Sequence, residues 1–136
     1  MESLLSKTAT EAGLGNTGED LAIHFEERRG WKTQKARGKA GYDLVSHGPK
    51  GKIRYIEVKK ESELRDVVYS LNVLRLGKRL ANFYLYIVNM PNDPNGKKTL
   101  YVVPPNVIFP NSEPYTQLLF RVKNVKQKGV ERHQLE

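Results

Sequence analysis

The run from residue 41 to residue 60, GYDLVSHGPKGKIRYIEVKK, decides the fold of this chain. Its centre, Gly48-Pro49-Lys50-Gly51, consists of turn-forming residues, and an apolar segment lies on each side of it. We therefore expect two antiparallel strands, at residues 42–47 and 52–60. Each strand carries one acid, Asp43 and Glu57, and an acid in an apolar strand is costly unless it is paired or binds a cation.

The expected hairpin brings chemically active side chains together. Glu57 and Lys59 are two residues apart, so they share one face of their strand. Pairing across the turn places Asp43 beside Glu57. Upstream, Glu19 lies in the first turn of an expected helix that packs on this sheet, and it is in a position to supply a third carboxylate.

Oxygen ligands of this kind suit hydrolysis of phosphodiesters. Two carboxylates recruit Mg²⁺, which keeps several waters and needs few protein ligands. The metal polarises a phosphoryl oxygen and acidifies water, and a lysine adds positive charge near the phosphorus. A Glu-x-Lys pair by itself is more often a solvated ion pair. Here the pair indicates catalysis because Asp43 and Glu19 accompany it within a strongly basic region.

Basic residues are concentrated in the same region. The chain has 23 Lys and Arg against 15 Asp and Glu, a net charge of +8. Between Arg28 and Lys60 there are 11 bases and two acids, an excess of nine that exceeds the net charge of the whole chain. Such a surface predicts a polyanionic partner, because phosphate neutralisation releases counterions.

Outward from the hairpin, the N-terminal third predicts an arm, a helix and a first strand. Residues 1–15 lack a clear period and are expected as an arm. Asn16-Thr17 followed by acids predicts a helix start, and Gly30 predicts its end. A strand at 31–37 and a turn at 38–41 then lead into the hairpin.

The C-terminal half predicts one long helix and more strands. Residues 64–80 carry two apolar stripes at helical spacing, the second covered either by a dimer partner or by more of the same core. Residues 83–88 predict a central strand, 89–98 a loop, and 99–103 another strand. We expect residues 106–114 to be irregular, 115–125 to form a last strand, and 126–136 to be a basic tail.

These elements predict a single α/β domain over residues 1–136, with its core at about 16–103 and a mixed sheet flanked by helices. The longest apolar stretch, Phe83 to Val88, is far shorter than the roughly 20 residues of a membrane helix. The absence of cysteine excludes disulfides and thiol chemistry. We expect a cytoplasmic protein without a membrane segment.

Gly41-Tyr42-Asp43, a turn, and Ile56-Glu57-Val58-Lys59 resemble the PD-(D/E)xK nuclease superfamily, which has a restriction-endonuclease-like core. Gly18-Glu19 resembles the first-helix glutamate of that superfamily. Together with the strand Tyr84-Leu85-Tyr86-Ile87-Val88, the pattern is most similar to the domain at the C-terminus of the plant protein NO VEIN. Archaeal Holliday-junction resolvases have a similar core.

The resemblance implies a role for each matching residue. It implies a metal, Mg²⁺ or Mn²⁺, bound by Asp43, Glu57 and the backbone carbonyl of Val58. It implies Lys59 as the catalytic lysine and Glu19 as a supporting acid. Gly41-Tyr42 stands where the superfamily often has a proline, a departure that spares the acids and the lysine.

The sequence therefore predicts a metal-dependent DNA endonuclease of restriction, repair or recombination type. The residues expected to hold the DNA backbone are Arg28, Arg29, Lys32, Lys35, Arg37, Lys39 and Lys60. The alternative is a module of the same fold that binds nucleic acid or protein without catalysis. A homodimer and a larger restriction or helicase partner are both compatible with the sequence.

Overall fold

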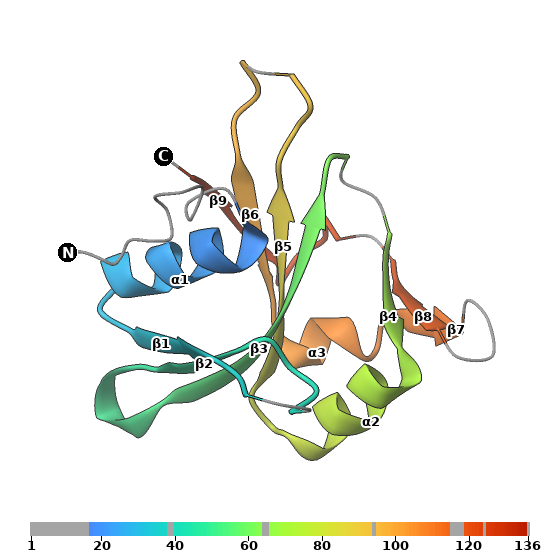
Figure 1. Cartoon of the computed structure of the whole chain (residues 1–136). Coiled ribbons are helices and arrows are strands. Elements are labelled where there is room, and N and C mark those ends of the chain that lie inside the picture. The colour runs from blue at the N-terminus through green and yellow to red at the C-terminus, as the bar shows by residue number, and fades with distance from the viewer. Residues whose placement is uncertain are drawn as a thin grey trace.

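The computed structural model describes residues 17–37, 40–63, 66–93, 95–114, 119–123 and 125–135. Its centre is a six-stranded mixed sheet with the order β1-β2-β3-β5-β6-β9 (Figure 1). β3 and β5 run parallel, and the other neighbouring strands of this sheet run antiparallel. The strands are β1 (Lys32–Lys35), β2 (Leu44–His47), β3 (Ile53–Glu61), β5 (Phe83–Asn89), β6 (Thr99–Val103) and β9 (Glu131–Gln134).

Both faces of this sheet are covered. Helix α1 (Gly18–Arg28) packs on one face and encloses a core that includes Leu44 and Ile56. The other face carries a second core, built with two helices and a small sheet of order β4-β8-β7 (Figure 1). These elements are α2 (Leu71–Arg79), α3 (Pro105–Ile108), β4 (Val67–Ser70), β7 (Ser112–Pro114) and β8 (Leu119–Val122). The expected α/β architecture is confirmed.

Helix α1 begins and ends where the sequence predicts. The Thr17 side chain accepts a hydrogen bond from the backbone N–H of Asp20 at 3.0 Å, which caps the helix. Gly30 follows the last turn with a φ of +86°, a conformation that favours glycine. Leu21 and Ala22 are buried against the sheet.

The β2–β3 hairpin is also confirmed. Leu44 pairs with Ile56, and a short 3₁₀ turn, Pro49–Gly51, joins the strands. Lys50 and Gly51 both have positive φ there. This register fixes the position of Asp43, directly before β2, relative to Glu57.

The long helix expected at residues 64–80 is wrong in its first half. Residues 67–70 form β4, and the helix begins only at Leu71. Val67 and Tyr69 are buried and alternate with the half-buried Val68, as in a strand, and β-branched and aromatic residues favour strands. Ser70 then caps α2 by accepting a hydrogen bond from the N–H of Val73.

The second apolar stripe of that segment faces the interior of the chain. Val73, Leu76 and Leu80 pack against the same core as Val67 and Tyr69. Of the two expected covers for this stripe, a dimer partner or the core of the same chain, the structure shows the core.

The central strands agree with the sequence. β5 lies between β3 and β6, and Leu85 to Val88 are all buried. β6 is buried along its whole length. Near-continuous apolar composition is typical of strands covered on both faces.

The C-terminal expectations need three corrections. The segment 106–114, expected to be irregular, contributes to α3 and contains β7. The strand expected at 115–125 ends earlier, because β8 stops at Val122, and residues 115–118 lie outside the described residues. The expected tail 126–136 contains β9, which pairs with β6 and extends the main sheet. The arm 1–15 and Lys39 lie outside the described residues. No described helix has the length and apolar character of a bilayer-spanning segment.

Candidate active site

Asp43 is fixed between two strands by hydrogen bonds at three of its atoms. Its backbone N–H donates to the carbonyl of Ile56 at 2.8 Å, and its carbonyl accepts from the N–H of Ala36 at 2.8 Å. Its carboxylate Oδ2 accepts from the N–H of Val58 at 2.7 Å. The side chain thus continues the pairing of β2 with β3 past the point where the strand ladder stops.

Glu57 and Lys59 project from β3 on the face opposite α1, since Ile56 and Val58 pack toward that helix. Lys59 Nζ lies 3.4 Å from Glu57 Oε2, and the two side chains are 30% and 12% exposed. The expected grouping of Asp43, Glu57 and Lys59 is therefore present in the structure.

The electrostatics of this group favour an added positive charge. Burial and, after it, the neighbouring Asp43 carboxylate together raise the pKa of Glu57 to about 7, against the opposing effect of Lys59. Two carboxylates packed together in a desolvated setting resist joint ionisation, so a bound cation stabilises both.

The donor set fits a hard divalent cation. Asp43 and Glu57 offer carboxylate oxygens. Val58 directs its N–H to the Asp43 side, and an extended residue presents its N–H and its carbonyl to the same strand edge. No group of three or more acidic or histidine side chains at metal-binding spacing occurs in the described ranges. Two carboxylates and a carbonyl match Mg²⁺, which retains water ligands.

Glu19 approaches this group from α1. Burial and the charge of Asp43 raise the pKa of Glu19, and Lys35 opposes the rise. Lys35 Nζ lies 3.8 Å from Glu19 and 3.6 Å from Asp20. Sequence analysis did not assign Asp20 to the site. Glu19 therefore lies close enough to Asp43 for their charges to interact.

The structure distributes the predicted DNA-binding residues over different surfaces. Lys35 and Lys60 lie on the α1 side of the sheet, where both line a cavity beside Glu19. Lys32 pairs with His47 in register and shares the face of Lys59. Arg37 is exposed after β1.

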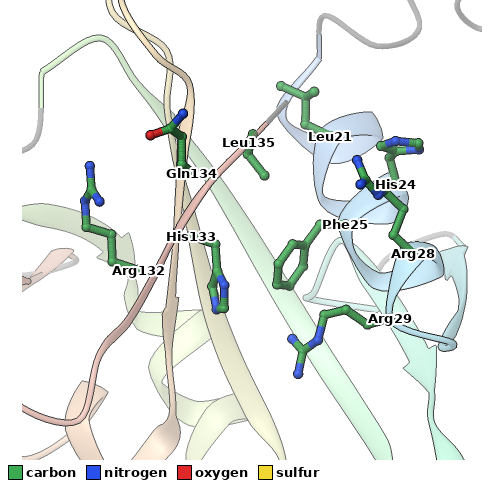
Figure 2. Close-up of a pocket in the computed structure, with 9 residues that line it drawn as sticks. All are labelled: Leu21, His24, Phe25, Arg28, Arg29, Arg132, His133, Gln134 and Leu135. Atoms are coloured by element: carbon green, nitrogen blue, oxygen red, sulfur yellow. The ribbon is translucent and has the colours of Figure 1, made fainter.

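Arg28 and Arg29 belong to a separate cavity. It lies between α1 and β9 and has a volume of about 460 Å³ (Figure 2). His24, another exposed residue of α1, also lines it, and His133 packs against Phe25 with ring centroids 4.8 Å apart. Arg29 also contacts the face of the Phe25 ring at 4.9 Å. These two arginines therefore belong to a surface built by α1 and β9.

Comparisons with known proteins agree with this architecture. No curated protein sequence matches the chain. The solved structure of Hjc, a Holliday junction resolvase from the archaeal hyperthermophile Archaeoglobus fulgidus, matches with a TM-score of 0.56 and 18% identity. The match covers 81% of this chain and 84% of that one, so the two share a nuclease-type fold.

The sequence resemblance to the PD-(D/E)xK superfamily is thereby confirmed at the level of fold. The model of the family described as the C-terminal domain of the protein NO VEIN matches residues 18–103, from the start of α1 to the end of β6. This range includes Glu19, Asp43, Glu57 and Lys59. The chain belongs to the family of the NO VEIN C-terminal domain.

Proposed function

We propose that this protein is a divalent-metal-dependent DNA endonuclease that hydrolyses phosphodiester bonds in the cytoplasm. The observation that carries the proposal is the grouping of Asp43, Glu57 and Lys59 where β2 begins beside β3, with the Asp43 carboxylate held by the N–H of Val58 at 2.7 Å. A surface ion pair alone would not require a second carboxylate packed against the first.

In this proposal, Asp43, Glu57 and the Val58 carbonyl hold Mg²⁺ or Mn²⁺. When bound, the metal supplies positive charge to the phosphoryl oxygens and acidifies water. Lys59 places its ammonium group where negative charge develops as water attacks phosphorus and the ester P–O bond breaks. Glu19 supports the group from α1, and Lys35 partly neutralises it.

DNA reaches the site over the basic surface. Lys32 and Lys60 flank the carboxylates on the two faces of the sheet. The other described contacts lie on α1 and β1 or within two residues of their ends: Arg28, Arg29, Lys35 and Arg37. Since the fold matches a Holliday junction resolvase, branched DNA is a substrate to test first. A homodimer, or a restriction or helicase partner, would direct the chain to its DNA substrate.

The test is a cleavage assay on plasmid, linear, single-stranded and four-way-junction DNA, with EDTA, Mg²⁺ or Mn²⁺. We expect metal-dependent cutting that falls at least about 100-fold in Lys59→Ala, because the ammonium acts only in the transition state. Lys52→Ala is the matched control: the same residue type, exposed just before β3 and outside the residues expected to hold the DNA. We expect it to cut within a few-fold of wild type.

Two results would contradict the proposal. One is cleavage by Lys59→Ala at the rate of the Lys52→Ala control. The other is the absence of cutting on every substrate, together with DNA binding that is equal with and without Mg²⁺. The second result favours the alternative, a module of this fold that binds nucleic acid without catalysis.

A further inference from the structure

A second basic cavity lies on the sheet face that carries Glu57 and Lys59. It has a volume of about 410 Å³. Its lining residues come from β5, β6, β9 and the loops between strands: Asn89, Lys97, Thr99, Tyr101, Lys126 and Arg132. Sequence analysis did not predict this convergence, because the three cations lie outside residues 28–60 and Lys97 is 29 residues from Lys126.

The three cations of this cavity lack carboxylate partners. Lys97, Lys126 and Arg132 are exposed, and none of them forms an ion pair with a described residue. Elsewhere in the molecule, Lys35 and Arg54 each have acidic partners. Like charges directed into one cavity repel one another, so this arrangement is stabilised by an anion.

The floor of the cavity carries hydrogen-bonding groups. Asn89 Oδ1 is buried and has no hydrogen-bond partner within the part of the chain that the structure describes. Beside it, Thr99 and Tyr101 are 3% and 5% exposed. A buried acceptor without a donor costs free energy, so a ligand that brings an N–H or O–H group is favoured.

The strand register connects this cavity to the candidate active site. Asn89 aligns with Glu61, four residues along β3 from Glu57, which is about 13 Å at about 3.3 Å per residue. Glu61 does not line the cavity. Tyr101 pairs with Arg132, and Tyr101 packs in the core on the Glu57 face, so Arg132 projects to that face too. In Figure 2, the Arg132 side chain accordingly extends away from α1, whereas His133 faces Phe25.

We propose that this cavity binds a nucleotide of the DNA substrate several positions from the phosphate that is cut. Its backbone phosphate meets Lys97, Lys126 and Arg132, and an N–H group of its base meets Asn89 Oδ1. This inference rests on the proposed function and specifies the path of the DNA: along the β3–β5–β6 face toward β9, in addition to the basic residues around α1 and β1.

The test measures DNA affinity in EDTA, where no cleavage occurs, by fluorescence anisotropy of a labelled duplex over a series of salt concentrations. The variant combines Lys97→Gln, Lys126→Gln and Arg132→Gln. The matched control neutralises three exposed lysines outside the cavity, with Lys50→Gln, Lys52→Gln and Lys78→Gln. Both lower the net charge equally, so they differ only in where the charge is removed.

We expect the cavity variant to raise the Kd at least tenfold and the control to raise it less than threefold. Each phosphate contact contributes about 0.9 to the slope of log association constant against log salt concentration. With three cations removed, we expect this slope to become shallower by about 2–3 in the cavity variant. Asn89→Asp, a near-isosteric change, should also weaken binding, because it adds a negative charge to the floor.

Equal affinities and equal salt slopes for the cavity variant and the control would overturn the inference while leaving the endonuclease proposal intact. Absence of DNA binding by the wild-type chain at low salt would overturn both. Thermal melting of each variant establishes that it is folded.

Discussion

Asp43 illustrates how much one residue does in this structure. Its backbone pairs with Ile56 and Ala36, and its carboxylate accepts a hydrogen bond from the N–H of Val58. The sequence predicted that Asp43 and Glu57 lie together, because hairpin pairing follows from the turn. It did not predict the bond to Val58, which forms where β3 continues past Ile56, the partner of the first residue of β2.

Asp43→Asn should remove cleavage and preserve the fold. The amide oxygen of Asn can still accept from the N–H of Val58, so we expect a change in stability of less than about 1 kcal/mol. One metal-binding charge is lost, so we expect cleavage to fall at least about 100-fold. DNA affinity in EDTA should stay equal or increase, since a negative charge is removed from the binding surface.

Cleavage assays and anisotropy measure these effects. Asp20→Asn is the matched control, because Asp20 pairs with Lys35 on the same surface but accepts no hydrogen bond from Val58. It should cut within a few-fold of wild type. Wild-type cleavage by Asp43→Asn would show that this carboxylate holds no metal.

Stability should fall as pH rises in the metal-free protein. The pKa of Glu57 is about 7 in the folded chain, against an ordinary value of 4.5. Between pH 4.5 and pH 7, Glu57 therefore binds more protons in the folded state than in the unfolded state. Ionising Glu57 therefore favours unfolding across this window. The loss is on the order of 3 kcal/mol, at about 1.4 kcal/mol per pKa unit.

Urea unfolding in EDTA at pH 4.5, 6 and 8 measures this dependence. Glu57→Gln should flatten the profile, and Mg²⁺ should stabilise the wild type more at pH 8 than at pH 4.5. A wild-type profile that is flat, or that rises from pH 4.5 to pH 8, would exclude the raised pKa.

At the scale of elements, α1 is joined to the sheet by a buried charged network. Glu26 of α1 is fully buried, with Oε2 3.8 Å from Arg54 of β3. The Arg54 guanidinium donates to the Tyr86 hydroxyl at 2.7 Å and lies over the rings of Trp31 and Tyr84, at 4.7 and 4.5 Å. The network fixes the helix that carries Glu19.

Arg54→Met should destabilise the protein by about 3 kcal/mol, because the buried Glu26 carboxylate then keeps one ion pair with a described residue, to Arg29 at 3.8 Å. The double variant Glu26→Leu/Arg54→Met removes both charges and should recover much of this loss. Urea unfolding compares the three proteins. A single variant as stable as wild type would show that the ion pair contributes nothing.

The same scale explains the wrong helix start at residue 64. Val67 and Tyr69 fit both a helical stripe and an alternating strand, since short apolar runs satisfy either period. Pairing with β8 decides between them, because Val67 and Tyr69 align with Val122 and Phe120. That partner is about 50 residues away in the sequence, so local propensity could not identify it.

At the scale of the whole molecule, the C-terminal segment completes the main sheet. β9 pairs with residues Thr99 to Val102 of β6 and forms one edge of the six-stranded sheet. It also supplies Arg132 to both cavities and His133 to the one beside α1. One strand thereby contributes to both basic cavities.

A chain that ends at Val130 should therefore be less stable than one that ends at Leu135, by about 3 kcal/mol or more. It loses the β6–β9 hydrogen bonds and exposes the edge of β6, where Leu100 and Val102 are buried. Thermal melting compares the two chains, and light scattering detects association through the free edge. Equal melting temperatures would show that β9 contributes no stability.

The sequence by itself determined the hairpin, α1 with its cap, the two central strands and the grouping of Asp43, Glu57 and Lys59. Each of these depends on turns, caps, alternation or short-range pairing, which are local. Only the tertiary structure decided that residues 67–70 pair with β8, that β9 joins β6, and that Lys97, Lys126 and Arg132 meet in one cavity. These contacts join distant segments, and side-chain packing and charge in the folded chain select them.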